Sequence, residues 1–299
     1  MAVYSKTLCA DFFKLEITTG EKFEDLVSYV AGQGIKKETT VEVKDDFFTR
    51  LESAGNWGGE YIEGQIVRLR MNSLPDKAGF GEPIQAIGFK DEEGVGESAA
   101  FLFQKKSKIL LLERNRNALT TYTFAEFFRR VGEIKGHINL NPVLQHDAYE
   151  KVFNARIVRK LVVQLAGPDN IGAAVANMEP SVGEMLKARQ SLRAPVAEFS
   201  YSIGRQRKEG LNREHVWGAV RDFLTLSKGQ DTHVEKLVVH GSLGPHEDFS
   251  VDLLESRLRG KDTVETTLER RIPYERKRDA LRRIWQRSKG EIEKLFGAE

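Results

Sequence analysis

Two short apolar runs separated by three polar residues constrain the fold of this chain most strongly. Residues 98–104 and 108–114 are rich in Phe, Leu, Ile and Ala, and Lys105, Lys106 and Ser107 lie between them. So short a polar break is typical of a β-hairpin, because the chain has room only to reverse its direction. The pattern therefore predicts two adjacent antiparallel strands joined by an exposed basic turn.

Strand-like and helix-like patterns alternate along the rest of the sequence. Period-two alternation and short apolar runs indicate strands, and apolar residues three or four apart indicate helices. The other expected strands are residues 9–18, 39–44, 61–71, 156–165, 196–203, 234–242 and 249–258. The expected helices are residues 22–31, 45–53, 123–131, 147–154, 182–192, 212–224 and 274–296. For the third of these helices, Thr123 is the expected N-cap and Glu126 completes a capping box.

These patterns predict an α+β fold with antiparallel or mixed sheets, flanking helices and a long basic C-terminal helix. A break in apolar periodicity around residues 140–155, next to Pro142, divides the chain into two halves. We expect an N-terminal α+β domain of residues 1–145 and a C-terminal α+β domain of residues 146–299 that ends in the basic helix.

Composition indicates the cellular location of the chain. Its longest apolar runs are strand-sized, so no membrane insertion is expected. Charged residues such as Lys6 and Asp11 interrupt the N-terminal apolar stretch, which is unlike a signal peptide. The single cysteine, Cys9, excludes an internal disulfide framework and a cysteine-based zinc cluster. A cytoplasmic location is the expectation.

Charge is distributed unevenly along the chain. Residues 1–100 hold 11 Lys and Arg against 18 Asp and Glu, whereas residues 257–289 hold 12 basic and 5 acidic residues. Such a separation indicates a partner with a phosphate backbone, or else an ordinary solvated face.

Basic side chains form three clusters that we interpret as phosphate contacts. The candidate nucleic-acid-binding residues are Lys105, Lys106 and Lys108 in the hairpin turn, Arg205, Arg207 and Lys208 in a second turn, and Arg276, Arg282, Arg283 and Arg287 in the terminal helix. That helix keeps an apolar stripe through Leu281, Trp285 and Ile292, so we expect its arginines to be replaceable without unfolding. Cations beside such a stripe suit backbone binding without base readout.

Catalytic signatures are not found. The chain has no phosphate loop, dinucleotide fingerprint or nucleophile elbow. His233, His240 and His246 precede an acidic stretch, but their spacing matches no standard metal site. The fragment Glu42-Val43-Lys44 leaves a metal-dependent nuclease open as an alternative, because nucleases use carboxylates with a nearby lysine. We expect no enzyme activity, no metal and no cofactor.

Two segments resemble RexA-type phage-exclusion proteins and, more distantly, the KwaB component of the Kiwa anti-phage system. The first is residues 94–103 with the second hairpin strand and the following helix, and the second is residues 238–243 with an acidic turn, a strand and the basic terminal helix. The resemblance implies a non-enzymatic DNA-binding homodimer that binds duplex without strong sequence preference and serves antiviral defence by phage exclusion or abortive infection.

The resulting hypothesis is a sequence-nonspecific, duplex-DNA-binding protein of a phage-defence system, with a second defence protein as a further expected partner. Two alternatives stay open: the metal-dependent nuclease, and a protein-interaction subunit whose acidic N-terminal half docks a partner protein.

Overall fold

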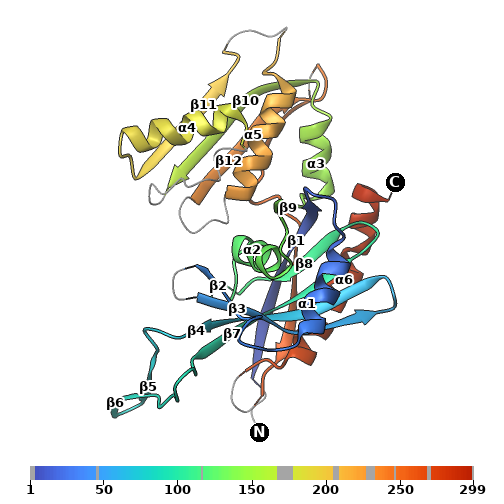
Figure 1. Ribbon diagram of the computed structural model, residues 1–299. Coiled ribbons are helices and arrows are strands. Elements are labelled where there is room, and N and C mark those ends of the chain that lie inside the picture. The colour runs from blue at the N-terminus through green and yellow to red at the C-terminus, as the bar shows by residue number, and fades with distance from the viewer. Residues whose placement is uncertain are drawn as a thin grey trace. The chain divides into compact units, whose positions relative to one another are not determined.

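The chain folds into two compact units, described here from a computed structural model that covers residues 4–44, 47–115, 117–166, 178–204, 209–226, 233–245, 247–267 and 271–297 (Figure 1). Unit 1 consists of Met1–Asn139 and Gly260–Arg287, and unit 2 of Leu140–Arg259 and Ser288–Glu299. The first change of unit lies close to the expected boundary at 145. The structure differs near the C-terminus, where a strand and most of a helix return to unit 1.

Unit 1 is built on a sheet with the strand order β14-β1-β8-β7-β4-β3-β2, and β9 also pairs with β1. The pairs from β1 through β8, β7, β4 and β3 to β2 are antiparallel. Its strands are β1 (Ser5–Ile17), β2 (Val41–Lys44), β3 (Phe47–Trp57), β4 (Tyr61–Arg70), β7 (Val95–Gln104), β8 (Ile109–Glu113), β9 (Ile138–Pro142) and β14 (Arg259–Glu265). The expected α+β class is confirmed. The strands farthest apart in sequence, β14 and β1, are neighbours at one edge.

The predicted hairpin is confirmed. Strands β7 and β8 pair antiparallel, with Phe101 opposite Leu112 and Gln104 opposite Ile109. The tight reversal between them places Lys108 in the left-handed region at φ 53°. The central strands are buried on both faces, which explains why their apolar runs are nearly continuous.

Helices α1 (Phe23–Gln33) and α2 (Thr121–Val131) cover one face of this sheet through an aromatic cluster. The Phe23 ring lies 4.9 Å from those of Phe103 and Phe128 and 6.0 Å from that of Phe124, and Phe101 meets Phe124 edge to face at 5.5 Å. Tilted and edge-to-face contacts at these distances are the preferred aromatic arrangement.

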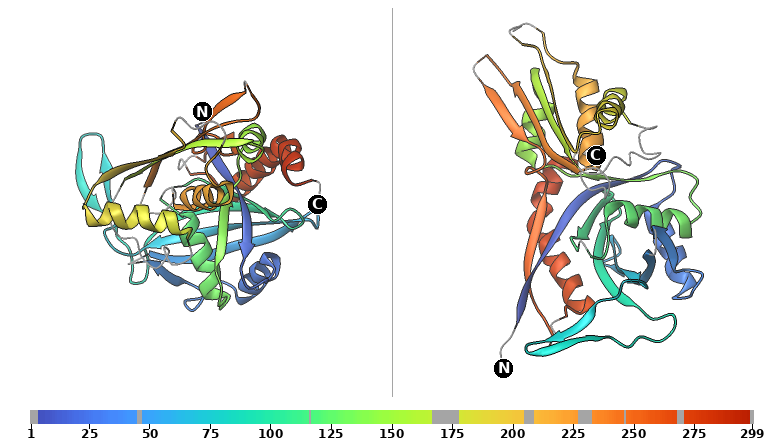
Figure 2. Two further views of the ribbon diagram at one scale, coloured as in Figure 1. Left: turned by 90° about the horizontal axis from the view of Figure 1, so that it is seen from above. Right: turned by 90° about the vertical axis from the view of Figure 1, so that its left-hand side faces the viewer.

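The opposite face of the sheet is covered by the unit 1 part, residues 274–287, of α6 (Tyr274–Phe296), as the right-hand view of Figure 2 shows. The Trp285 ring lies 6.0 Å from that of Phe12 and 5.6 Å from that of Tyr61, and the indole N–H donates to the Tyr61 hydroxyl at 3.2 Å. A buried indole needs such an acceptor. The helix has the bounds that the sequence predicts.

The expected helix at residues 45–53 is wrong. From Phe47 onward these residues belong to β3, which pairs with β2 on one side and β4 on the other. The segment FFTRL carries β-branched and aromatic residues that suit either state locally. Pairing on both sides decides the matter in favour of the strand.

The N-cap of α2 also differs from the expectation. The cap is Thr120, whose hydroxyl accepts the Thr123 N–H at 3.1 Å, while the Thr120 N–H donates to the Thr123 hydroxyl at 2.8 Å. Thr123 is thus the third helical residue of the capping box rather than its first member. Glu126 takes no part in the capping box and instead forms ion pairs with Arg129 and Arg130.

Unit 2 is a four-stranded antiparallel sheet with the order β11-β10-β12-β13. Its strands are β10 (Ile157–Ala166), β11 (Val196–Ser202), β12 (His233–Ser242) and β13 (Asp248–Asp252), and its helices are α3 (His146–Phe153), α4 (Pro180–Ser191) and α5 (Arg213–Leu226). Alternate residues of the central strands, such as Leu161, Val163 and Val239, pack with Phe223 of α5 in one hydrophobic core.

The strand expected at residues 249–258 is shorter than predicted. After β13 the Asp252 carboxylate accepts the Leu254 N–H at 2.9 Å, and the Asp252 carbonyl accepts the Ser256 N–H at 3.1 Å. An aspartate that captures backbone N–H groups in this way ends a strand and starts a turn.

A second hairpin was not predicted from the sequence. Strands β5 (Asp76–Gly79) and β6 (Glu82–Ala86) pair only with each other, and every residue in them is exposed. Phe80 in the connecting turn is fully exposed, and Ile84 is 70% exposed. Isolated two-stranded hairpins are marginal in water, so these apolar side chains are an unusual feature of unit 1.

Close packing at Gly64 in β4 gives a test of this fold. A Cβ atom there would lie 2.6 Å from the Phe101 ring and 2.7 Å from the Ser53 carbonyl oxygen, whereas Gly55 in β3 has open space around its Cα. Gly64→Ala should therefore lower the free energy of unfolding by about 1–3 kcal/mol through overpacking. Urea unfolding measures it, with Gly55→Ala as the matched control; equal effects of the two substitutions would contradict the packing.

Candidate nucleic-acid interface

The structure separates the predicted phosphate contacts. Arg205, Arg207 and Lys208 lie outside the described residues. The other seven belong to unit 1, in two places: Lys105, Lys106 and Lys108 in the β7–β8 turn, and Arg276, Arg282, Arg283 and Arg287 on α6.

Helix α6 and strand β14 run side by side in opposite directions. The strand packs so closely against the helix at Gly260 that a Cβ there would lie 2.0 Å from the Ile284 side chain. Near the start of the helix, the Arg276 guanidinium donates to the Glu265 carbonyl at 2.9 Å and to the Thr266 carbonyl at 3.2 Å. Arg276 therefore holds the end of this edge strand.

Two further arginines, one helical turn apart, share one carboxylate of β14. Arg283 donates to Asp262 at 2.8 Å, and Arg287 donates to Asp262 at 3.2 Å and to the Lys261 carbonyl at 2.8 Å. Burial acts to raise the Asp262 pKa, but the hydrogen bonds from both arginines outweigh it and leave that pKa below its usual value. The carboxylate is thus an anion that fixes both guanidinium groups.

Exposure distinguishes these arginines from their partner. The side chains of Arg283 and Arg287 are 54% and 55% exposed, whereas that of Asp262 is 12% exposed. Each guanidinium carries five N–H donors, and Asp262 accepts hydrogen bonds from only some of them. The arrangement presents two oriented cations to solvent against one recessed anion, an excess of one positive charge.

Arg282 is turned the other way, onto the sheet. It makes a two-fold contact with Glu63 of β4, at 2.9 Å through Nε and 2.6 Å through a terminal nitrogen, and its guanidinium lies 4.9 Å from the centre of the Trp57 ring. The Glu63 side chain is only 8% exposed. The hydrogen bond to Glu63 is the main reason that the pKa of Arg282 is raised. Arg282 is therefore part of the packing between the helix and the sheet. For this arginine, the expectation that it can be replaced without loss of stability does not hold.

Lys277 is buried in the same interface. Its ammonium group lies 3.1 Å from a Glu113 carboxylate oxygen and donates to the Ser98 carbonyl at 2.9 Å and hydroxyl at 3.1 Å. The same Glu113 oxygen accepts the Ala100 N–H at 2.8 Å. Both charged side chains are less than 10% exposed. A buried ion pair needs such additional hydrogen bonds to offset the cost of desolvation.

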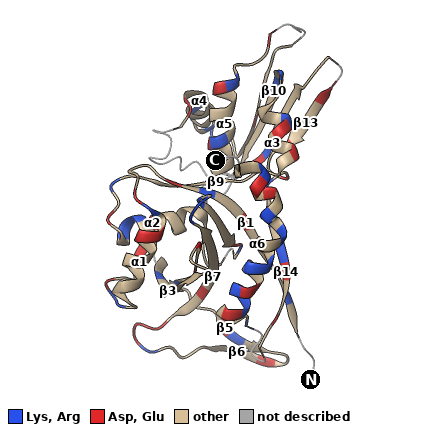
Figure 3. Ribbon diagram, turned by 90° about the vertical axis from the view of Figure 1, so that its right-hand side faces the viewer, with Lys and Arg blue, Asp and Glu red and all other residues tan. Residues whose placement is uncertain are grey.

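The basic appearance of α6 is therefore largely balanced within unit 1. Figure 3 shows Lys and Arg along the helix and on β14, with Asp and Glu between them. Residues 274–287 contain six cations and two carboxylates. Glu63, Glu113 and Asp262 of the sheet supply three further carboxylates, which leaves one positive charge in excess. Sequence reasoning identified the cations but not these anionic partners.

The turn lysines differ from one another. Lys105 donates to the Gly59 carbonyl at 2.8 Å and is half-buried. Lys106 and Lys108 are exposed, and within the described part of the chain their ammonium groups form no hydrogen bond or ion pair. Only these two remain as solvent-facing cations in the turn.

Of the nuclease alternative, the described residues include Glu42 but not the Lys44 side chain. Glu42 is exposed on β2, and its carbonyl accepts a hydrogen bond from Arg130 at 2.5 Å. The Lys44 side chain, the His233 side chain and His246 lie outside the described residues. Among the residues that are described, no group of three or more His, Cys, Asp or Glu is placed to hold a metal ion.

The contrast between the inward and the outward arginines gives a second test. Arg282→Ala should lower the free energy of unfolding by about 3 kcal/mol, because it removes both hydrogen bonds to the buried Glu63 and leaves only Arg278, at 3.8 Å, as a cationic partner. Arg283→Ala should cost under about 1 kcal/mol, because its side chain is half exposed and Arg287 still holds Asp262. Denaturant titration measures the free energy of unfolding of both variants. If Arg283→Ala lowers it as much as Arg282→Ala does, the distinction between inward and outward arginines is refuted.

The helices of the described residues were compared with the length and hydropathy of a membrane span. None of these helices is long and apolar enough to cross a membrane.

Comparison with known proteins places the chain in a family. A search among curated proteins matches none of them to this chain. A model of the family described as "Family of unknown function (DUF6731)" matches residues 50–293, which include β4, β7, β8, β14 and nearly all of α6. Because this match spans most of the sequence, the chain belongs to DUF6731, a family of unknown function.

Proposed function

We propose that this protein is a non-catalytic binder of duplex DNA that contacts the phosphate backbone without sequence preference. The observation that carries the proposal is the pair Arg283 and Arg287, half exposed and held by the recessed Asp262. Guanidinium groups fixed in this way lose little side-chain entropy when they bind an anion. Residues four apart on a helix are about 6 Å apart along its axis, so both reach the same strip of surface.

Of the other described cations that the sequence predicts as phosphate contacts, only some are retained in the proposal. Lys106 and Lys108 serve as additional phosphate contacts because they are exposed and lack partners among the described residues. Arg276, Arg282 and Lys105 are left out because their donors already bind neighbouring groups of unit 1. The excess of positive charge is small, which favours weak, salt-sensitive binding.

The biological setting is part of the same proposal and rests on the resemblance to phage-exclusion proteins. In that setting the chain is a cytoplasmic homodimer that acts in antiviral defence, by phage exclusion or abortive infection, with a second defence protein as a further partner. No metal and no cofactor is needed for backbone binding.

A second candidate function, the protein-interaction subunit, is favoured by one specific feature. The β5–β6 hairpin exposes Phe80 and Ile84 although its strands pair with no other strand. Exposed apolar side chains on an isolated hairpin suit docking to a partner protein, which would bury them.

The proposed DNA contacts can be tested by salt-dependent binding. Arg283→Gln with Arg287→Gln should weaken binding to two duplexes of unrelated sequence by the same factor, because phosphate contacts carry no base information. The slope of log affinity against log salt should become shallower by about 1.8, from about 0.9 per lost contact. Fluorescence anisotropy at several salt concentrations measures both quantities.

The control for this experiment removes the same charge elsewhere in unit 1. Lys37 pairs with Glu92 and Arg50 with Glu52 on the surface. Lys37→Gln with Arg50→Gln should leave the salt slope unchanged. Duplex binding that both double variants weaken equally would show a general effect of net charge, and wild-type protein that binds no duplex at low salt would exclude the proposal.

The interaction candidate has a separate readout. Phe80→Ser with Ile84→Ser should leave the free energy of unfolding within about 0.5 kcal/mol of wild type, because surface substitutions away from packed sites cost little. Light scattering at increasing concentration should show self-association or partner binding reduced in this variant. Unchanged association would remove the hairpin from consideration as a docking element.

A further inference from the structure

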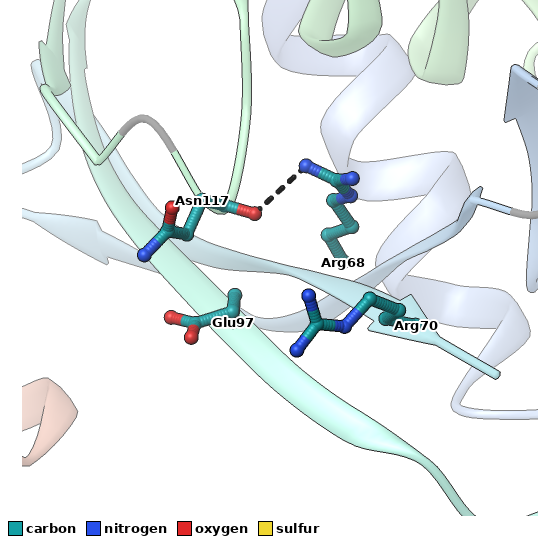
Figure 4. A pocket seen from close by; sticks show the side chains of 4 residues that line it. All are labelled: Arg68, Arg70, Glu97 and Asn117. Atoms are coloured by element: carbon teal, nitrogen blue, oxygen red, sulfur yellow. Dashed lines mark hydrogen bonds between the residues drawn. The ribbon is translucent and has the colours of Figure 1, made fainter. Parts of the chain in front are cut away.

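A small pocket opens on the sheet of unit 1, away from α6. It has a volume of about 170 Å³ and is lined by Arg68, Arg70, Glu97 and Asn117. Figure 4 shows both arginines rising from the same strand, β4, with Glu97 on the neighbouring β7. Side chains two positions apart on a strand point to the same face and are separated by about 7 Å, so both guanidinium groups border one space.

Arg68 is held in place by two contacts. Its guanidinium donates to the Asn117 carbonyl at 2.9 Å, the bond drawn in Figure 4, and lies over the Phe47 ring at 3.3 Å from the ring centre. Burial, together with the nearby charge of Arg70, lowers the pKa of Arg68, and the charge of Glu97 opposes this shift without outweighing it. The side chain is thus oriented by neutral groups, and it forms no ion pair with a described carboxylate, although Glu97 is near enough to act on its charge.

Arg70 has no such contacts. Among the described residues its guanidinium forms no hydrogen bond or ion pair, although it is only half exposed and borders the pocket. Glu97 lies opposite Arg68 in the register of the paired strand, and Figure 4 shows its carboxylate directed away from the Arg70 guanidinium, at the border of the same pocket. Its carboxylate also forms no ion pair with a described residue. Two cations and one anion therefore border the same pocket, and contacts with described residues leave most of their hydrogen-bonding capacity unused.

We propose that this pocket binds a small phosphate monoester whose organic part carries an amino or hydroxyl group. A carboxylate has two oxygens, which one guanidinium fork saturates, whereas a phosphate offers three terminal oxygens and can accept from two forks at once. Glu97 accepts hydrogen bonds only, so it selects a ligand with a donor beside the phosphate.

The size and charge of the pocket set it apart from the proposed DNA surface. A volume of about 170 Å³ is below the range of about 300–1,000 Å³ that is typical of sites for larger organic ligands. Glu97 inside the pocket repels a second phosphate group. The site therefore suits a single monoester rather than a polynucleotide strand, and it does not depend on the proposed function.

Isothermal titration of the full chain with inorganic phosphate, O-phosphoethanolamine and acetate tests the site. We expect phosphate to bind, O-phosphoethanolamine to bind more tightly, and acetate to bind at least tenfold more weakly than phosphate. Arg70→Gln should weaken phosphate binding at least tenfold. This substitution removes no contact among the described residues, so the variant should fold as wild type does.

Two further variants assign the contacts. Glu97→Gln should retain phosphate binding and lose the preference for O-phosphoethanolamine, whereas Arg50→Gln on neighbouring β3, held by Glu52, should bind as wild type does. Absence of phosphate binding, or equal binding by wild type and the Arg70 variant, would overturn the proposal. Duplex binding is measured on the same Arg70 variant and should be unchanged, which separates failure of this site from failure of the DNA surface.

Discussion

The attachment of α6 to the sheet of unit 1 depends on carboxylates that sit where apolar side chains are expected. Glu63 and Glu113 lie on central strands, each less than 10% exposed, and each is met by a cation from the helix. Burial of either carboxylate alone would be strongly unfavourable. Arg282 and Lys277 therefore fix the rotation of the helix on the sheet, since only one face of α6 brings both cations to their partners.

That rotation has a functional consequence, because it decides which cations face solvent. With Lys277 and Arg282 directed inward, Arg283 and Arg287 are placed over β14 and meet Asp262. One helix thus carries two kinds of arginine that the sequence does not distinguish: one kind holds the fold and the other is available to an anionic partner. On the other side of the sheet, the pocket at Arg68 and Arg70 also presents cations, of which Arg68 is held by neutral groups.

Local sequence patterns predicted most of the elements but few of their partners. The β7–β8 hairpin and the bounds of α6 follow from apolar spacing within each segment. The strand β3 could not be separated from a helix in this way, because its state depends on pairing with β2 and β4. The contact between Glu63 and Arg282 joins residues 219 positions apart, beyond the reach of any local pattern. A signal did exist: Glu63 alternates with Tyr61 and Val67 on the face that packs on α6.

The orientation of α6 on the sheet depends most directly on the coupling between the helix and the buried carboxylates. A double-mutant cycle on Lys277→Met and Glu113→Gln measures it through the free energy of unfolding of the two single variants and the double variant. If the ion pair orients α6 on the sheet, the interaction energy should be about 2 kcal/mol or more, with the double variant more stable than the sum of the single losses implies. An interaction energy near zero, with additive losses, would show that the helix is held by its apolar contacts alone and would contradict the account.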